Sequence, residues 1–257
     1  MELTGGLLTK TLNAMGNRNG MFTASRIGDL MAGGQGKTAL NYIFEIAENL
    51  NGFKKEISTK PMLHGIVNEV TAIEILTSIY GGEPNQTFYK VNDKLGATPD
   101  AILEGKWVAD SKCQYSIFNY FEQCDKLAKK YYLQLQVQMM ALNVDYGYLI
   151  NYLTKPEEFG QDDWCEYPFP LEERFYIHEV PKDEEICDKI LATCEEKYAL
   201  IGVADELLRN AKLMDEDEFF YMQFVSKKRY QKLKDINWVN WDGEVIINEK
   251  TAWVCKS

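Results

Sequence analysis

The most informative stretch of the chain is Thr98-Pro99-Asp100-Ala101-Ile102-Leu103-Glu104-Gly105-Lys106-Trp107-Val108-Ala109-Asp110-Ser111-Lys112. Two apolar runs, 101–103 and 107–109, are separated by a short connection that contains a glycine, which predicts a β-hairpin. Because side chains alternate between the two faces of a strand, Asp110 and Lys112 point the same way. Asp100 begins the first strand, so closure of the hairpin brings its carboxylate across from that pair.

Two carboxylates and an amine at one end of a hairpin are suited to Mg²⁺-dependent phosphodiester cleavage. Mg²⁺ prefers carboxylate oxygens and keeps several waters, which leaves positions for phosphate oxygens. A bound metal lowers the pKa of a water, and a nearby lysine positions that water or stabilises the charge that builds on phosphorus oxygens. An isolated Asp-x-Lys is more often a solvated surface feature, so this hypothesis needs further residues.

A third carboxylate, Glu69, is predicted on a helix over residues 62–80, which follows Pro61 and ends before two glycines. Helical spacing predicts one stripe that contains Met62, Ile66, Glu69, Ile73, Leu76 and Tyr80. Glu69 then interrupts an apolar face, where a buried carboxylate needs a metal or another cation beside it. The alternative is a salt-bridged glutamate at the margin of the stripe.

Residues 131–142 predict a helix that is apolar on nearly every side and yet carries Gln134, Gln136 and Gln138. Gln134 and Gln138 share a face at a spacing of i, i+4. Because buried amides need partners, we expect these two to hydrogen-bond the hairpin, metal-bound waters or the substrate backbone. Pairing with neighbouring backbone is the alternative.

These residues together resemble the lambda exonuclease and YqaJ-type viral recombinase nucleases, a family within the PD-(D/E)xK superfamily. The similar segments, in chain order, are Arg18 with Phe22-Thr23-Ala24-Ser25, Gly65 with Glu69, Asp100 with Asp110-Ser111-Lys112, and Tyr132-Leu133-Gln134-Leu135-Gln136. The resemblance covers roughly residues 18–200. It implies an α/β, restriction-endonuclease-like core, with a central mixed β-sheet flanked by helices. We assign residues 1–218 to this nuclease domain and residues 219–257 to a small C-terminal β appendage.

The resemblance also implies an activity, a Mg²⁺-dependent 5′-to-3′ exonuclease on linear double-stranded DNA. The products are mononucleotides and a 3′ single-stranded overhang for recombination by strand annealing. Two metal ions are expected, with Mn²⁺ as a substitute for Mg²⁺. The implied partners are DNA ends, a single-strand annealing protein and further copies of the chain in a trimeric ring. The alternatives are an endonuclease of the same superfamily in repair or restriction and a non-catalytic protein that binds DNA ends.

By resemblance, the metal is held by Glu69, Asp100, Asp110 and the carbonyl of Ser111, while Lys112 orients or activates the water and Gln134 supports the ligands. Arg18 and Ser25 are expected to meet the terminal 5′-phosphate. A further phosphate-binding arginine of the family falls here at Gln35, and Lys37 is the expected substitute. Asp110 also departs from the family, because the closest relatives carry glutamate there and aspartate reaches less far by one methylene.

A rival motif, Gly33-Gly34-Gln35-Gly36-Lys37-Thr38, looks like the end of a phosphate-binding loop of an NTPase. The full motif needs glycine at position 31, where this chain has Met31, and it follows a buried strand. Residues 23–32 instead have the spacing of a helix that is capped by Thr23 or Ser25. The NTPase reading is therefore disfavoured.

Composition is typical of a globular chain with a large core, because 46% of the 257 residues are hydrophobic. No apolar run approaches about 18 residues, so we expect no membrane span. The first residues show no signal for secretion, which favours a cytoplasmic protein. The six cysteines include no Cys-x-x-Cys pair, and we expect free thiols and no iron–sulfur cluster.

The formal net charge of −11 is unevenly distributed. Residues 157–218 contain 20 Asp and Glu against 6 Lys and Arg, whereas the remaining residues contain 19 against 22. A locally basic channel with an acidic exterior would favour threading of DNA ends. An acidic surface that only keeps the protein soluble is an equally good explanation.

The expected helices span 23–33, 38–50, 62–80, a broken 117–143 and 183–213. The expected strands span 86–91, 97–104, 107–113, 145–153 and 173–180. In the C-terminal appendage, Asp242-Gly243 predicts the turn of a hairpin. Its basic and aromatic residues suit either stacking on bases or packing on the protein itself.

Overall fold

The computed structural model of the chain describes residues 18–32, 37–52, 59–154, 169–212, 244–247 and 251–254. Its helices are α2 (Ile27–Leu30), α3 (Lys37–Leu50), α4 (Lys60–Tyr80), α5 (Ile117–Asp125), α6 (Lys129–Leu142) and α7 (Glu184–Lys212), with short 3-10 turns η1 (Ala24–Arg26) and η3 (Leu171–Glu173). Its strands are β1 (Phe22–Thr23), β2 (Glu83–Pro84), β3 (Tyr89–Lys90), β4 (Leu95–Ala97), β5 (Ala101–Leu103), β6 (Trp107–Gln114), β7 (Tyr146–Leu153), β8 (Phe175–Pro181), β9 (Glu244–Ile247) and β10 (Thr251–Val254).

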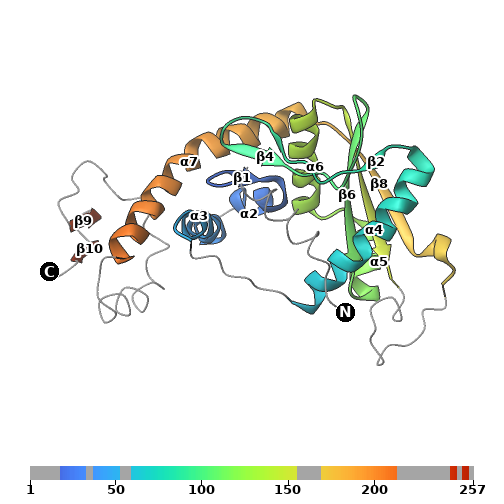
Figure 1. Ribbon diagram of the computed structural model, residues 1–257, viewed down its shortest axis with the longest axis horizontal. Helices are drawn as coiled ribbons and strands as arrows, with labels where there is room; N and C mark the ends of the chain where they lie inside the picture. The colour runs from blue at the N-terminus through green and yellow to red at the C-terminus, as the bar shows by residue number, and fades with distance from the viewer. Residues whose placement is uncertain are drawn as a thin grey trace.

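The central sheet has five strands in the order β2-β5-β6-β7-β8 (Figure 1). β6 and β7 are parallel, and every other neighbouring pair is antiparallel. Such a parallel pair needs a crossover, which α5 and α6 provide between the two strands. The predicted α/β fold, with a mixed sheet flanked by helices, is confirmed.

The two central strands are buried on both faces, because a helix covers each face. Trp107 and Ala109 of β6 pack in a cluster with α4, while Val108, between them, packs in a cluster with α6. This alternation follows the two-residue period of a strand. Asp110 and Lys112 continue the period of Val108 and therefore lie on the face that α6 covers.

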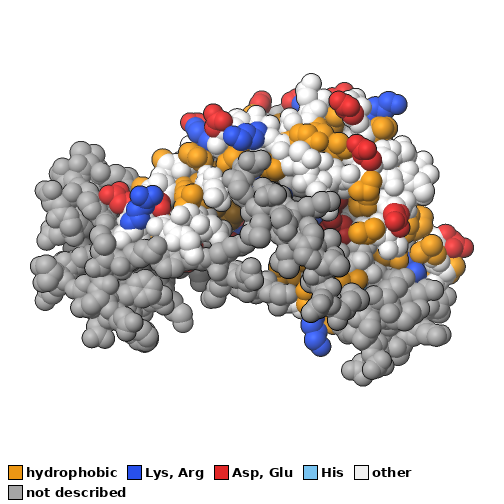
Figure 2. All heavy atoms as spheres, in the orientation of Figure 1, with side chains coloured by type: hydrophobic (Ala, Val, Ile, Leu, Met, Phe, Trp, Pro, Cys, Tyr) orange, Lys and Arg blue, Asp and Glu red, His pale blue; other side chains and the backbone are white. Residues whose placement is uncertain are grey.

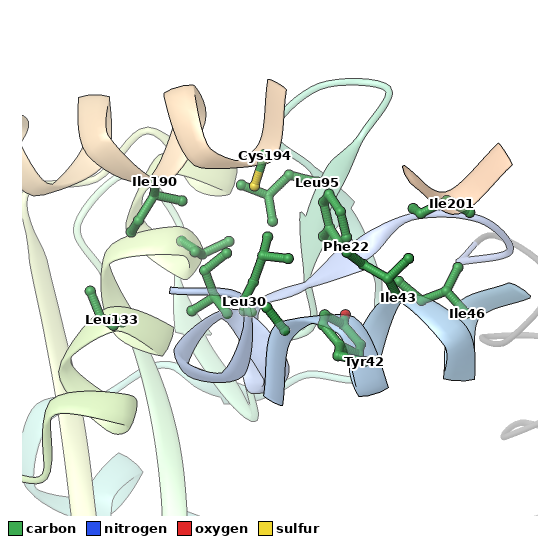
Figure 3. Packing of buried hydrophobic residues seen from close by; sticks show 14 of the residues in the cluster. Phe22, Leu30, Tyr42, Ile43, Ile46, Leu95, Leu133, Ile190, Cys194 and Ile201 are labelled. Carbon is green, nitrogen blue, oxygen red and sulfur yellow. The ribbon is translucent and has the colours of Figure 1, made fainter. Parts of the chain in front are cut away.

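A second core lies beside the sheet, where α2, α3 and α7 enclose the small sheet β1-β4-β3 (Figure 3). It includes Phe22, Leu30, Ile43 and Leu95, each fully buried. Leu133 of α6 belongs to the same cluster, so α6 contributes to both cores. In Figure 1, α7 extends from the central sheet along α2 and α3.

The helix predicted for residues 23–33 is wrong over its first part. Phe22 and Thr23 pair in parallel with Leu95 and Gly96 instead, and α2 begins only at Ile27. The Thr23 N–H donates to Tyr42 Oη at 2.9 Å. Partners far along the chain therefore draw this backbone into a strand, which local spacing does not reveal. Residues 33–36 lie outside the described residues.

Several other predicted elements agree with the structure, although their bounds shift. The helix over 117–143 is broken as expected, with residues 126–128 between α5 and α6. The strand over 97–104 is divided into β4, which belongs to the small sheet β1-β4-β3, and β5, which belongs to the central sheet. The strand over 86–91 is reduced to β3, while β2 precedes it.

The predicted stripe of α4 is only partly correct. Ile73 and Leu76 are buried, but Met62, Ile66 and Tyr80 are 52%, 56% and 38% exposed. The buried positions nearer the start of the helix are polar, namely His64 and Asn68. These two are stabilised by hydrogen bonds, because His64 Nε2 contacts Thr154 Oγ1 at 2.7 Å and Asn68 Nδ2 donates to His64 O at 2.8 Å. Figure 2 shows hydrophobic side chains at the surface over α4.

The C-terminal hairpin exists, but its turn is displaced from the predicted position. β9 and β10 are antiparallel, and Ile247 pairs with Thr251. Asp242-Gly243, where the sequence predicts the turn, precedes β9 in sequence and lies outside the described residues.

None of the helices that the structure describes combines the length and the apolar character that a membrane span needs.

Candidate active site

The hairpin of β5 and β6 places the central residues of the candidate site. Gly105 in its turn has a φ of +68°, a conformation that favours glycine. Ala101 lies opposite Ala109, and the Asp100 N–H donates to Ala109 O at 2.8 Å. This register continues toward Asp110, so Asp100 and Asp110 lie across from each other at the open end of the hairpin.

The Asp100 carboxylate accepts two hydrogen bonds on one oxygen. The Ser111 N–H and Oγ donate to Asp100 Oδ2 at 2.7 and 3.0 Å. Asn85 braces the same segment, because its Nδ2 donates to Pro99 O and its N–H donates to Asp100 O, both at 2.8 Å. Burial, followed by repulsion from Asp110 and Glu69, raises the pKa of Asp100 well above its ordinary value.

Asp110 is 2% exposed and is held by three side chains. Its Oδ1 accepts from Gln134 Nε2 at 2.5 Å and from Gln138 Nε2 at 2.9 Å. Its Oδ2 accepts from Lys112 Nζ. α6 therefore contacts the hairpin through Gln134 and Gln138, the two glutamines that share one face of the helix.

Lys112 is a cation between the carboxylates. Burial lowers its pKa, but attraction by Asp110 and Asp100, together with the hydrogen bond to Asp110, raises the pKa above its ordinary value overall. The Nζ also lies 5.2 Å from the centre of the Tyr131 ring, within cation–π range. Lys112 is thus protonated at neutral pH in this arrangement.

Glu69 is half-buried on α4, at the margin of the packed face of this helix. Burial and repulsion from Asp110 raise its pKa, while Lys112 opposes the shift. Because Glu69 interacts electrostatically with Asp110, Lys112 and Asp100, it belongs to the same site as the two aspartates. A half-buried Glu69 at the margin differs from a glutamate within a fully buried stripe.

The donor chemistry of this site fits a hard divalent cation, because three carboxylates and the Ser111 carbonyl are oxygen ligands. Within the described ranges, no group of three or more His, Cys, Asp and Glu residues is arranged as a preformed metal site. The aspartates are instead engaged with residues of their own hairpin, Asp110 with Lys112 and Asp100 with Ser111. The mutual repulsion of the carboxylates remains, and a cation would relieve it.

Arg18 lies beside the entry to the hairpin. Its Nη2 donates to Thr98 Oγ1 at 2.5 Å, and its guanidinium lies 5.3 Å from the centre of the Phe88 ring. Burial lowers its pKa. Its Nε is buried and has no hydrogen-bond partner in the described part of the chain. β1 and β4 are neighbours in the small sheet, where Phe22 pairs with Leu95 and Thr23 with Gly96, so the segments that carry Arg18 and Thr98 lie near each other.

The other two predicted phosphate contacts are less closely tied to the site. Ser25 is exposed on η1, and its Oγ lies 3.5 Å from Thr23 Oγ1. Lys37 is the first residue of α3, and its side chain lies outside the described residues.

Three contributors escaped sequence reasoning, namely Asn85, Thr98 as the acceptor for Arg18, and Tyr131 beside Lys112. Thr98 and Tyr131 adjoin recognised motifs, so their positions offered a weak signal. Asn85 lies in a loop with no motif, and only the folded chain reveals its contact.

Comparison with known proteins gives one family and several solved structures. Residues 15–144 match the model of the YqaJ-like viral recombinase domain. This range contains the hairpin, Glu69 and both glutamines that contact Asp110. A search of curated proteins finds no match.

The chain is similar to an alkaline exonuclease from Laribacter hongkongensis, with 20% identity and a TM-score of 0.65 over 79% of this chain and 100% of that one. A second structure of that exonuclease, in complex with dAMP, matches with 21% identity, the same TM-score and the same coverage. A phage-related exonuclease from Haemophilus somnus 129PT matches with 20% identity and a TM-score of 0.62, over 74% of this chain and 96% of that one. The fold is therefore shared with these exonucleases.

Proposed function

Because this chain belongs to the YqaJ-like viral recombinase domain family, and is therefore a nuclease, we propose that it is a Mg²⁺-dependent 5′-to-3′ exonuclease that acts on linear double-stranded DNA. The products are mononucleotides and a 3′ single-stranded overhang. The observation that carries this proposal is the convergence of Glu69, Asp100 and Asp110 around Lys112. Groups with shifted pKa values that share one site are characteristic of catalytic centres.

In this proposal, the metal ligands are Glu69, Asp100, Asp110 and the Ser111 carbonyl. Mg²⁺, or Mn²⁺ in its place, supplies a water of lowered pKa and offsets the charge on the phosphate, and two ions suit the number of ligands. Gln134 fixes the orientation of Asp110 through their hydrogen bond. Lys112, protonated and close to both aspartates, orients the water and stabilises negative charge on the phosphate oxygens.

Recognition of the 5′ end is assigned to Arg18, Ser25 and Lys37. Arg18 supports this role best, because its Nε is buried without a partner among the described residues while Nη2 is anchored on Thr98. A phosphate oxygen suits such a guanidinium, which binds anions through directed N–H groups. Thr98 lies two residues before Asp100, so a phosphate held at Arg18 lies near the proposed metal ligands.

The wider context of the proposal comes from the family. We place the protein in the host cytoplasm as a ring-shaped trimer, where it acts with a single-strand annealing protein in recombination. DNA ends are its substrate in this context.

The test compares three duplexes in Mg²⁺, namely linear with a 5′-phosphate, linear with a 5′-hydroxyl, and covalently closed. The variant is Lys112→Ala, and the matched control is Lys106→Ala, which removes an exposed lysine from the turn of the same hairpin. Wild type and Lys106→Ala should release mononucleotides from linear DNA and leave closed circles intact. Lys112→Ala should be slower by about 100-fold or more.

Three outcomes contradict parts of this proposal. Strong cutting of closed circles indicates an endonuclease. Equal rates for Lys112→Ala and wild type remove the catalytic assignment, and no cleavage of any substrate supports a protein that only binds DNA ends. Equal rates on the two linear duplexes remove the role of Arg18 in binding the 5′-phosphate.

A further inference from the structure

Gln138 contacts the same carboxylate oxygen as Gln134 does. It is fully buried in α6, and its Nε2 lies 2.9 Å from Asp110 Oδ1. Gln134 Nε2 reaches this oxygen at 2.5 Å. The two glutamines are one helical turn apart, so they approach Asp110 from successive positions along one ridge of the helix.

The orientation of the Gln138 amide follows from its partner. A flipped amide would direct Oε1 at the Asp110 carboxylate, where two acceptors would repel each other. In the orientation that donates to Asp110, Oε1 is buried and accepts no hydrogen bond from the described residues. A buried acceptor without a donor destabilises the fold. The hydrogen bond from Gln138 Nε2 to the buried Asp110 carboxylate offsets this cost, so Gln138 brings one satisfied and one unsatisfied polar group into the interior.

We propose that Gln138 is a positioning residue that acts through Asp110, and this inference rests on the proposed metal-dependent nuclease function. Together with Gln134, it saturates Oδ1 and fixes the plane of the carboxylate. The oxygen left for a cation is then Oδ2, which contacts Lys112 in this structure. The amides of Gln134 and Gln138, both on α6, thereby fix the orientation of the Asp110 carboxylate.

Gln136 provides a matched comparison on the same helix. It is as deeply buried as Gln138, but both ends of its amide have partners away from the site. Its Nε2 donates to Pro181 O at 3.0 Å, and its Oε1 accepts from the Asp183 N–H at 2.8 Å. Gln136 thus joins α6 to the end of β8 and to the loop before α7, away from Asp110, which gives it a structural role.

The experiment replaces each glutamine by methionine, which is similar in size and has no amide. Two properties are measured without DNA, namely the melting temperature of the metal-free protein and the affinity for Mn²⁺ by titration calorimetry. Gln138→Met removes both the unsatisfied acceptor and the donor to Asp110, so it should change the melting temperature little, and it should weaken Mn²⁺ binding by about 10- to 100-fold, as for other residues that orient metal ligands. Gln136→Met should lower the melting temperature and bind Mn²⁺ as wild type does.

The outcomes separate this inference from the proposed function. If wild type binds no Mn²⁺, both are overturned. If wild type binds Mn²⁺ and Gln138→Met binds it equally well, this inference alone is overturned. It is also overturned if both methionine variants lose affinity equally, because a loosened α6 then explains the loss. Gln138→Leu, measured in the same way, should repeat the result of Gln138→Met with a differently shaped side chain.

Discussion

Asp100 shows how the site keeps like charges close together. Its Oδ2 accepts two hydrogen bonds from Ser111, which favour the charged form, yet burial and the neighbouring carboxylates raise its pKa well above the ordinary value. The metal-free site is therefore strained by its own charges. Such strain is common where the geometry serves catalysis.

Replacing Asp100 by asparagine tests whether this carboxylate lowers the stability of the metal-free protein while it serves the nuclease activity. Asparagine keeps an acceptor for the Ser111 donors and removes one negative charge, so the metal-free protein should gain about 1 kcal/mol, or about 2–4 °C in melting temperature. Nuclease activity should fall by about 100-fold or more. Thermal unfolding and a cleavage assay measure the two effects. Asp93→Asn is the control, because that side chain is 99% exposed and should change neither property.

The pH dependence of stability follows from the shifted pKa values of Asp100 and Glu69. Each pKa is raised in the folded protein above ordinary values of 3.8 and 4.5, so the folded state binds these protons more tightly than the unfolded state. The resulting stabilisation is fully present below the ordinary values and is lost as pH rises through the folded-state values. The metal-free protein should therefore lose stability from these groups over that window.

Mg²⁺ should counteract this loss, because it neutralises the carboxylates that repel each other. The increase in melting temperature on adding Mg²⁺ should therefore be larger at pH 8 than near pH 5.5. Scanning fluorimetry across that range, with and without Mg²⁺, measures the difference. An increase that is constant with pH would contradict the role of these carboxylates in binding the metal.

At the scale of elements, α6 connects the two cores to the site. Leu133 packs in the core around α3 and α7, while Leu135 packs against the central sheet. The same helix presents Gln134 and Gln138 to Asp110. A shift of α6 should therefore change both the stability of the protein and the orientation of Asp110, a proposed metal ligand.

The contact between α2 and α6 depends on Gly28. A Cβ at this position would lie 2.9 Å from Lys130 Cβ and 3.1 Å from Lys130 Cα, closer than side chains tolerate. Gly28→Ala should force the helices apart, lower stability by about 1–3 kcal/mol and reduce activity. Chemical denaturation and the cleavage assay measure these effects.

Gly202→Ala is the matched control for Gly28→Ala. Gly202 lies within α7, and a Cβ there would meet nothing within 4 Å. Alanine should therefore raise stability by up to about 1 kcal/mol through its higher helix propensity. If Gly28→Ala is also stabilising, the close packing of α2 on α6 is wrong.

At the scale of the whole molecule, the core beside the sheet extends into α7, which ends at Lys212, before the proposed boundary at residue 218. Ile201 and Ala204 of α7 are buried in this core, and Leu208 packs against it. A chain that ends at residue 218 should therefore unfold cooperatively within about 3 °C of the full chain and still cleave DNA. Calorimetry and the cleavage assay compare the two. Failure of the shorter chain to fold would contradict the division at residue 218.

The sequence predicted those parts of the fold and of the site that depend on the repeating geometry of one strand or one helix. The hairpin, the common face of Asp110 and Lys112, and the pair of Gln134 with Gln138 follow from the periods of strand and helix, and the structure has all three. These periods are set by backbone geometry, which is the same in any fold.

Three features depend on the tertiary structure and could not be predicted, namely the buried face of α4, the strand at Phe22-Thr23 and the position of Arg18. α4 is apolar on several sides, so the sheet and the partners of His64 and Asn68 select the face that is buried. Likewise, β4 is more than 70 residues away from β1 in sequence, yet the two strands pair, and Arg18 contacts Thr98 in the same region. Sequence alone therefore determined the hairpin and its chemistry, because these depend on neighbouring residues. The tertiary structure decided what surrounds them, because burial and pairing depend on partners distant along the chain.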